Sequence, residues 1–533
     1  MMKSYTFTGT KNRYSKSELS PVQLCDKTTV PSEMGYNCTC FRTDMMGYAD
    51  TMMNDMIGTH SLAPLYERVA GEMAGLIEQG TFRAGDRVPS IRQSSRRFDV
   101  SINTVMQAYN LLEDQRLIEA RPQSGYYVRA RALEIHEPDI PLRVALTPAT
   151  VTISDLCQQV IRNMMNPDLL PLWSAIPHPN HLPVDKLNRM LASEVRRCGR
   201  QSVSYLMTPG YDRLRVQVAQ RGLVAGISAG PDEVLITSGC VEAVMLALRA
   251  TCRSGDTIAV ESPFYFNFLQ LIAELGLKAL EIPSTPREGI SIEALSYAIE
   301  HNSISACLVI PSFSNPLGSL MPDERKRELV ELLARHEIPL IEDDIYGDLS
   351  LSNERPLAAK SFDRKGLVIY CSSFSKTLTP GYRVGWAIAG RFQSEMERLK
   401  IMMNVATSSP PQLALAGFLA AGGYDHHLRS IRRIHGRNLS LMTEAVGRYF
   451  PPGTRMTRPL GGFILWVEMP EGTDAITLFH LALECGIGIA PGPLFSLSDK
   501  YRNFIRLSAA YWDEYIEQGI KKLGELAQGL QKG

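Results

Sequence analysis

Short apolar, β-branched runs alternate with helical segments over residues 153–530, and this alternation constrains the fold more than any other feature of the sequence. Examples of the runs are EVLITSG, DTIAVES, ACLVIPS, IPLIEDD and GLVIYCSSFS. Strands separated by helices are typical of an α/β domain with a mostly parallel sheet. Each run ends in small, polar or charged residues, and ligands of such domains gather at the carboxyl ends of the strands. The sequence therefore predicts a binding site at one edge of this sheet.

The strand ends supply a set of candidate site residues in a fixed order: Ser238, Gly239, Cys240, Tyr265, Asn315, Asp343, Tyr346, Ser373, Lys376 and Arg383. The turn at 238–240 contains glycine and opens a helix, which suits a phosphate held on backbone N–H groups. Asn-Pro-x-Gly, Asp-x-x-Tyr, Ser-x-Ser-Lys and a following arginine occur at these spacings. In this order they resemble the fold-type I pyridoxal-phosphate enzymes of the aspartate aminotransferase superfamily, over residues 170–530.

This resemblance implies that Lys376 holds pyridoxal 5'-phosphate as an internal aldimine, and that Lys376, Asp343 and Tyr346 are the catalytic residues. Asp343 is expected to keep the pyridine nitrogen protonated, so that the ring acts as an electron sink. Asn315 and Tyr346 are expected to hydrogen-bond the ring hydroxyl oxygen, and Tyr265 to stack on the ring. The phosphate is expected to lie among Ser238, Gly239, Cys240, Ser373 and Arg383, with Cys240 contributing its backbone N–H.

The same resemblance assigns roles to two residues outside this set. Tyr205, in YLMTPGYDRLR, is expected to reach the phosphate of a partner subunit, which implies a homodimer with shared sites. Arg506, in NFIRLSAA, is expected to bind the α-carboxylate of an amino acid. Core packing for Tyr265 and a surface strand charge for Arg506 remain alternative interpretations. The segment 173–183, WSAIPHPNHLP, departs from the family, in which a glycine and then Pro-Asp are common, so the sequence gives no ground for assigning the ligand preference of a typical aminotransferase.

Residues 61–129 form the first organised segment. Leu65, Val69, Met73 and Leu76/Ile77 recur at helical spacing, and Gly80 follows as a helix end. Ser90 and Ser101 are expected to cap a second and a third helix, and Val105, Tyr109 and Leu112 to face inward. A strand, the turn Pro-Gln-Ser-Gly and a second strand complete a winged helix-turn-helix. The motifs LYERVA, IEQGTFRAGDRVPSIR, VSINTVMQAY and SGYYV resemble the GntR family of bacterial regulators.

A basic stretch in this segment favours DNA as the partner. Residues 83–97 hold five arginines and one aspartate, next to a helix N-terminus that suits phosphate contacts. By resemblance, the DNA-facing residues are Arg92, Ser101, Asn103, Thr104, Ser124 and Gly125. Asn103 can pair bidentately with adenine. Ile102 stands where many relatives carry arginine, so a base contact is either absent or replaced by an apolar one. A domain serving only dimerisation, and Arg96 and Arg97 as merely solvated charges, are the alternatives.

The remaining segments set the domain limits. Residues 1–60 are polar and Met-rich, and we expect either a disordered tail or sequence added by an upstream start codon. Residues 130–152 contain prolines and little periodicity, as in an interdomain linker. Cys38 and Cys40 form an isolated pair that predicts no metal site. No apolar run is long enough to span a bilayer, and the chain carries no secretory signal, so a cytoplasmic protein is expected.

The expected fold class is a multidomain chain: an N-terminal α+β winged helix-turn-helix and a C-terminal α/β fold-type I domain. Their fusion resembles the MocR subfamily of transcriptional regulators. The predicted function is a homodimeric DNA-binding regulator that binds an operator with two half-sites and senses pyridoxal phosphate or a small amino compound. A working pyridoxal-phosphate-dependent aminotransferase with an appended DNA-binding domain is the competing hypothesis, and control of cofactor supply is a third.

Overall fold

The computed structural model of the protein describes residues 64–82, 86–115, 117–121, 124–128, 136–138, 140, 146–151, 155–164, 166–352, 354–498 and 500–531. The chain divides into two units, 1–62 and 63–533. The predicted tail at 1–60, with Cys38 and Cys40, lies outside the described residues. None of the helices in the described part of the chain is long and apolar enough to cross a membrane.

The N-terminal segment folds as a winged helix-turn-helix, as predicted. Its helices are α1 (Leu65–Glu78), α2 (Ile91–Phe98) and α3 (Ile102–Asp114), and its wing pairs β1 (Ile118–Arg121) antiparallel with β2 (Gly125–Val128). The predicted inward residues Val105, Tyr109 and Leu112 are fully buried. Of the residues at helical spacing in α1, Val69 and Met73 are buried, whereas Leu65, the first residue of the helix, is 55% exposed.

Local capping fixes where α2 and α3 begin. The Ser90 hydroxyl accepts a hydrogen bond from the Gln93 backbone N–H, and the Gln93 side chain accepts one from the Ser90 N–H, which makes a capping box. The Ser101 hydroxyl accepts a hydrogen bond from the Thr104 N–H at 3.1 Å. Each cap satisfies a helix N–H that has no partner within the helix, so both predicted caps are confirmed.

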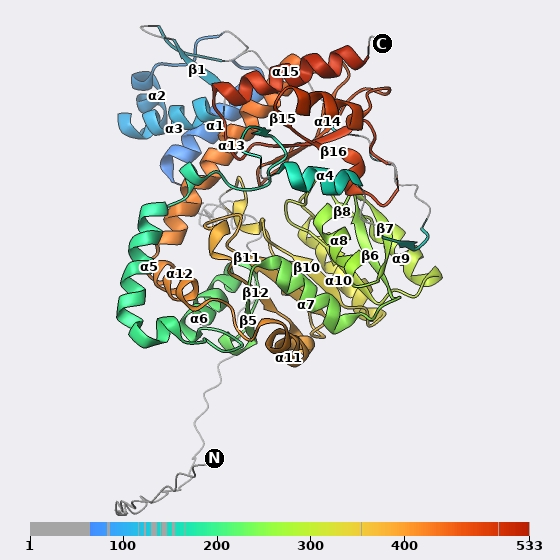
Figure 1. Cartoon of the computed structure of the whole chain (residues 1–533). Coiled ribbons are helices and arrows are strands. Elements are labelled where there is room, and N and C mark those ends of the chain that lie inside the picture. The colour runs from blue at the N-terminus through green and yellow to red at the C-terminus, as the bar shows by residue number, and fades with distance from the viewer. Residues whose placement is uncertain are drawn as a thin grey trace, which may run out of the picture. The chain divides into compact units, whose positions relative to one another are not determined.

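The C-terminal domain is built on a large, mostly parallel sheet (Figure 1). Its strands follow the spatial order β3 (Ala149–Thr150), β7 (Lys278–Thr285), β6 (Thr257–Ser262), β9 (Ala306–Val309), β10 (Leu340–Asp343), β11 (Val368–Ser373), β12 (Gly385–Ile388) and β5 (Val234–Thr237). The run from β7 to β11 is parallel, while β3 and β12 are antiparallel to their neighbours. The short β8 (Gly289–Ile290) pairs with β7.

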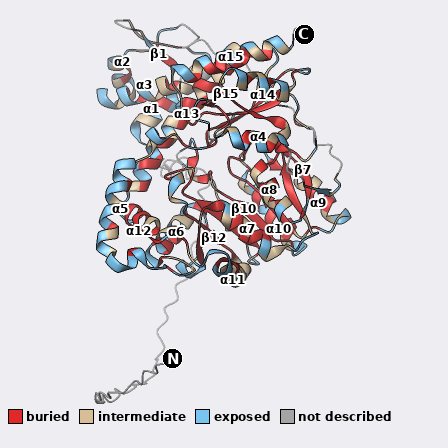
Figure 2. Cartoon of the chain, in the orientation of Figure 1, coloured by how far each residue is buried: buried red, intermediate tan, exposed pale blue. Residues whose placement is uncertain are grey.

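Helices cover both faces of this sheet, which explains why the strands are apolar throughout (Figure 2). Side chains alternate between the faces: in β9, Ala306 and Leu308 pack with α7 (Cys240–Thr251), α8 (Phe266–Glu274) and α11 (Gln393–Asn404). Cys307 and Val309 pack with α9 (Ile292–His301) and α10 (Asp323–Arg335) on the other face. The predicted parallel α/β sheet is therefore confirmed.

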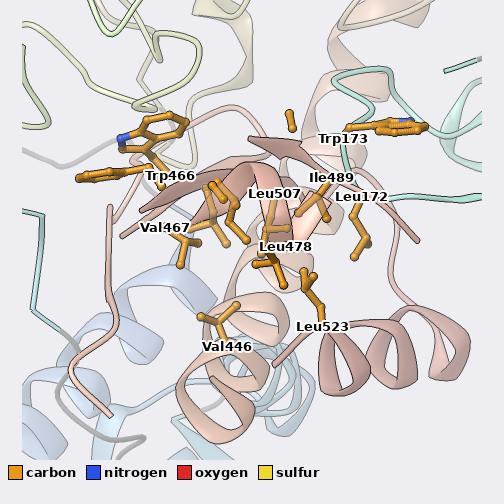
Figure 3. Packing of buried hydrophobic residues seen from close by; sticks show 14 of the residues in the cluster. Leu172, Trp173, Val446, Trp466, Val467, Leu478, Ile489, Leu507 and Leu523 are labelled. Atoms are coloured by element: carbon orange, nitrogen blue, oxygen red, sulfur yellow. The ribbon is translucent and has the colours of Figure 1, made fainter. Parts of the chain in front are cut away.

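A second, antiparallel sheet lies toward the C-terminus, in the order β13 (Arg455–Met456), β14 (Ile464–Glu468), β17 (Phe504–Ser508) and β16 (Ala490–Pro491). Figure 3 shows its core, in which Val467 and Leu507 face Val446 of α13 (Gly423–Tyr449), Leu478 of α14 (Ala475–Glu484) and Leu523 of α15 (Glu514–Leu530). Because Ile505 and Leu507 both pack into this core, Arg506 between them points to the opposite face of β17.

The end of the predicted linker, 130–152, is integrated into the C-terminal domain where the structure describes it. Residues 149–150 form β3, an edge strand of the large sheet, and the Met456 N–H donates to the His136 carbonyl at 3.0 Å. Ile140 and Val151 are buried in hydrophobic clusters of this domain. The described part of this segment is therefore docked chain rather than a free tether.

Candidate cofactor site and DNA-reading elements

A cavity of about 250 Å³ lies at the carboxyl ends of the strands, where the sequence predicted a site. It gathers the predicted residues Cys240, Tyr265, Asn315, Asp343, Tyr346, Lys376, Arg383 and Arg506. Residues that the sequence analysis did not assign also line it, notably Ala175, Ile176 and Ser375. Side chains far apart in the chain thus meet because parallel strands deliver their ends to one edge of the sheet.

Lys376 follows β11 and reaches into this cavity. Its Nζ donates a hydrogen bond to the Ala175 carbonyl at 2.5 Å and lies 5.9 Å from the centre of the Tyr346 ring. Burial lowers the pKa of Lys376 to about 8, and the charge of Arg506 acts in the same direction. The amine therefore becomes uncharged, and nucleophilic, as the pH rises through about 8.

Asp343 ends β10 and lines the same cavity as Lys376. Its Oδ1 accepts hydrogen bonds from the Cys240 thiol and from the Ile345 backbone N–H, each at 3.1 Å. Burial raises the pKa of Asp343 to about 7. A buried carboxyl of this kind gains stability from a cationic partner. Cys240 thus contacts Asp343 through its side chain, a role that the sequence analysis did not assign.

Arg506 reaches the cavity from β17 of the second sheet, and it is only 1% exposed. The interpretation of Arg506 as a surface charge is therefore wrong. Its guanidinium donates to Asn315 Oδ1 at 2.9 Å and to the Trp173 carbonyl, and its Nε has no hydrogen-bond partner among the described residues. None of the described carboxylates lies within ion-pairing distance of it, and burial lowers its pKa. A buried cation without a counter-charge is costly, so this position favours an anionic ligand.

Arg383 is a second cation of the cavity. Its guanidinium donates to the Ser375 hydroxyl and to the Ser238 carbonyl, both at 3.2 Å, and no acid in the described part of the chain pairs with it. Gly239, at φ 93°, precedes the first residue of α7, and a Cβ there would overlap the Arg383 guanidinium. Glycine is therefore required beside this arginine, at a helix N-terminus that itself attracts anions.

Of three other predicted residues, only Tyr346 lines the cavity, and Ser373 and Tyr205 do not. Ser373 is buried at the end of β11, where its hydroxyl accepts a hydrogen bond from the Ser375 N–H at 3.2 Å, whereas Ser375 lines the cavity. Tyr346 is 2% exposed, and its hydroxyl has no hydrogen-bond partner within the described residues. Tyr205 does not line the cavity of its own chain: it is 75% exposed.

The predicted DNA-facing side chains lie on accessible parts of the winged helix-turn-helix. Arg92 of α2 and Asn103 of α3 are exposed; Ser101 is the N-cap of α3, and Thr104 lies in its first turn. At the wing tip the Ser124 and Tyr127 hydroxyls lie 2.6 Å apart, and Gly125 has φ 106°. A Cβ on Gly125 would lie 3.2 Å from the Arg87 guanidinium, so an arginine from before α2 reaches the wing.

Comparison with known proteins matches both the N-terminal and the C-terminal domain. The model for bacterial regulatory proteins of the gntR family matches residues 65–128, and the model for aminotransferase class I and II matches 180–523. The chain is 38% identical to the uncharacterized HTH-type transcriptional regulators YdcR and YjiR of Escherichia coli, and the YdcR match covers 87% of this chain and 99% of YdcR.

The C-terminal domain also resembles solved enzymes. LysN, an α-aminoadipate aminotransferase of Thermus thermophilus crystallised with N-(5'-phosphopyridoxyl)-L-leucine, is 30% identical with a TM-score of 0.66, over 72% of this chain and 96% of LysN. The fold and the cofactor that the sequence predicted agree with these matches. The chain belongs to the family of DNA-binding transcriptional regulators in which a GntR helix-turn-helix domain is joined to a pyridoxal-phosphate-type aminotransferase class I and II domain, the MocR architecture.

Proposed function

We propose that this regulator binds pyridoxal phosphate at Lys376. Its affinity for an operator changes when the cofactor, or an amino compound joined to it, occupies the cavity. The observation that carries the proposal is the pair of arginines Arg383 and Arg506, which share one cavity with Lys376 and have no acidic partner among the described residues. A phosphate and a carboxylate are the two anions that a cofactor and an amino acid would bring.

The residues present fit this cofactor. Bound pyridoxal phosphate supplies an aldehyde for an amine and a pyridinium ring that withdraws electrons from the α-carbon of an amino ligand. Lys376 offers an amine that loses its proton near pH 8, and Asp343 offers a buried carboxylate to hold a proton at the ring nitrogen. The unpartnered Tyr346 hydroxyl, with Asn315, suits the ring oxygen.

The phosphate would lie at the N-terminus of α7. Arg383 provides the charged fork, and Gly239 and Cys240 provide backbone N–H groups. Ser375 lines the cavity, whereas the predicted Ser238 and Ser373 do not. The Ser375 hydroxyl accepts a hydrogen bond from Arg383, which also donates to the Ser238 carbonyl. Tyr265 borders the cavity, and its ring makes a T-shaped contact with the ring of Phe268, with ring centres 5.3 Å apart. We expect this tyrosine to stack on the cofactor ring. Arg506 then takes the α-carboxylate of an amino ligand.

A homodimer would explain why Tyr205, which is expected to reach the phosphate of a partner subunit, is exposed in its own chain. It lies in an exposed apolar face with Val203, Met207, Ile401 and Met402, which are between 46% and 88% exposed. The two segments of this face lie side by side, because the Thr208 hydroxyl donates to the Val405 carbonyl at 3.0 Å. Such a face favours burial against a second copy. Two linked DNA-reading domains would bind two half-sites, since the second contact becomes intramolecular. Sedimentation equilibrium should then give twice the mass of the chain.

A working aminotransferase is the second candidate, and Lys376, Asp343 and Arg506 in one cavity favour it. The test measures two properties of the same full-length preparation loaded with pyridoxal phosphate. Selection from a random DNA library reports sequence preference, and absorbance after mixing with an amino donor and a keto acid reports turnover. A regulator selects a defined operator and turns over slowly. Rapid turnover without sequence preference would support the enzyme instead.

A further inference from the structure

The exposed face of the recognition helix α3 has an unusual composition for a DNA reader. Val105, Ala108, Tyr109 and Leu112 face the domain core, so the opposite face is free. Its side chains form two i, i+4 rows along the helix. The rows are Ile102, Met106 and Asn110 in one, and Asn103 and Gln107 in the other, and all of these residues are exposed. Ile102 is 49% exposed and Met106 is 44% exposed.

This face carries no charge. The acids of α3, Glu113 and Asp114, lie in its last turn, and neither arginine nor lysine occurs in the helix. The commonest base contact in the major groove, arginine or lysine on guanine, is therefore not available from α3. What the face offers is two apolar side chains and three carboxamides.

Positive charge is placed instead on α2. Arg92, Arg96 and Arg97 are all exposed there, and Arg87 approaches the wing at Gly125. These arginines suit the phosphates on both sides of a groove, which position a protein on DNA but do not read its sequence. The charge distribution thus favours a polyanion against this domain, with the uncharged face of α3 toward the bases.

We propose that α3 reads A·T base pairs, with Ile102 and Met106 packing on thymine methyl groups and Asn103 and Gln107 reading adenine. Thymine is the only base whose major-groove edge presents a methyl group, and a carboxamide matches the adenine N6/N7 pair. The base pairs that α3 faces, at the centre of each operator half-site, are then A·T-rich. The inference rests on the DNA-binding function of the family and names what that function recognises.

The test begins with an operator selected by the full-length protein and replaces each thymine in turn by deoxyuridine, which removes only the methyl group. Where Ile102 or Met106 makes contact, affinity should fall about fourfold for each methyl removed, the effect of burying one such group. Ile102→Ala should weaken the thymine operator by a similar factor and make it insensitive to uracil at one position. Ile102→Val keeps a β-branched contact and should retain that sensitivity.

A matched control separates this contact from general effects on the domain. Leu65→Ala removes an equally exposed apolar side chain from α1, and it should leave the uracil effect unchanged. In a second arm, each adenine is replaced by 7-deazaadenine, which removes the N7 acceptor. At the position that Asn103 reads, this replacement should weaken operator binding by the native protein. It should leave the affinity of Asn103→Ala unchanged.

Different outcomes overturn different statements. If selection yields no preferred sequence, the regulator function and this inference both fail. A G·C centre, or uracil operators bound as tightly as thymine operators, overturns the inference alone. If Ile102→Ala alters the sedimentation of the free protein and not its base preference, the apolar pair is a protein interface and the inference is also overturned.

Discussion

Lys376 owes its proposed reactivity to its surroundings. Burial, together with the charges of Arg506 and Arg383, disfavours its protonated form, whereas Asp343 favours it. Burial and the two arginine charges together outweigh the effect of Asp343, so the pKa of Lys376 falls from the usual value of 10.5 to about 8. The fraction of nucleophilic amine therefore increases as the pH rises through 8, about 2.5 pH units below the value for a solvated lysine.

The pH dependence of cofactor attachment follows. The rate at which apoprotein traps pyridoxal phosphate, followed by absorbance, should rise with a midpoint near pH 8. Borohydride should then fix a phosphopyridoxyl group on Lys376, and Lys376→Ala should carry none. A midpoint near 10.5, or labelling of Lys376→Ala, would contradict the assignment. Lys360, which is bonded to Asp363 and to the Val368 carbonyl away from the cavity, is the lysine to monitor as an unlabelled control.

Arg506 should discriminate among ligands by their carboxylate. Arg506→Gln keeps hydrogen-bonding capacity for Asn315 but removes the charge, and a bond to a charged group contributes about 1.5–3 kcal/mol. Spectral titration should therefore show about 10- to 100-fold weaker binding of an L-amino acid. The amine that lacks the carboxylate should bind the variant and the native protein alike. Equal losses for both ligands would mean that Arg506 acts through the structure of the cavity and not through the carboxylate.

The motif residues could be predicted from the sequence because a cofactor demands particular side chains in a particular order. The structure brings Lys376, Asp343, Asn315 and Arg506 into one cavity as expected. Ser375 was missed because the motif contains two serines, and only the turn after β11 decides which hydroxyl faces the cavity. The carbonyls of Trp173 and Ala175 also could not be predicted, since a backbone acceptor leaves no trace in residue type.

At the scale of elements, the long helix α13 holds the turn that carries Lys376. The Tyr424 hydroxyl lies 2.8 Å from the Thr377 hydroxyl and 2.9 Å from Asp348 Oδ2, and His427 Nε2 lies 2.7 Å from the Thr377 carbonyl. Both α13 residues are buried, so their hydrogen bonds are not replaced by water when one partner is removed. The helix therefore fixes the peptide directly after Lys376.

Tyr424→Phe should lower the free energy of unfolding by about 1–3 kcal/mol, because it removes one hydrogen bond from the partly buried carboxylate of Asp348 and one from the buried hydroxyl of Thr377. Urea denaturation of the full-length protein checks this value. Tyr515→Phe, at a tyrosine that is 62% exposed, is the control and should change nothing measurable. If both substitutions have the same effect, the contact between α13 and Thr377 does not stabilise the fold.

Elements differ in how well the sequence predicts them. The caps at Ser90 and Ser101 and the core face of α3 were predictable, because capping and helical periodicity are local. The docking of Ile140 and β3 onto the C-terminal domain was not, since two-residue strands carry no pattern of their own and are fixed by the partner strand β7.

For the whole molecule, the chain joins a DNA-reading domain to a ligand-binding domain. Regulation requires that ligand binding to one domain changes the free energy of DNA binding by the other. A ligand changes operator affinity only if it binds one arrangement of the readers better than another. The proposed homodimer supplies such arrangements, because the spacing of two readers must match the spacing of two half-sites. Cofactor occupancy at Lys376 is the event expected to bias that spacing.

The most direct test is the affinity of the full-length protein for its selected operator, measured by fluorescence anisotropy at fixed salt. Apoprotein, cofactor-loaded protein and Lys376→Ala are compared, each with and without an amino acid. We predict that loading the native protein changes operator affinity by about 5- to 150-fold, the usual range of coupling between sites. Lys376→Ala should bind as apoprotein does in every condition. Identical affinity of the apo and loaded native protein, across all amino acids tried, would contradict the account.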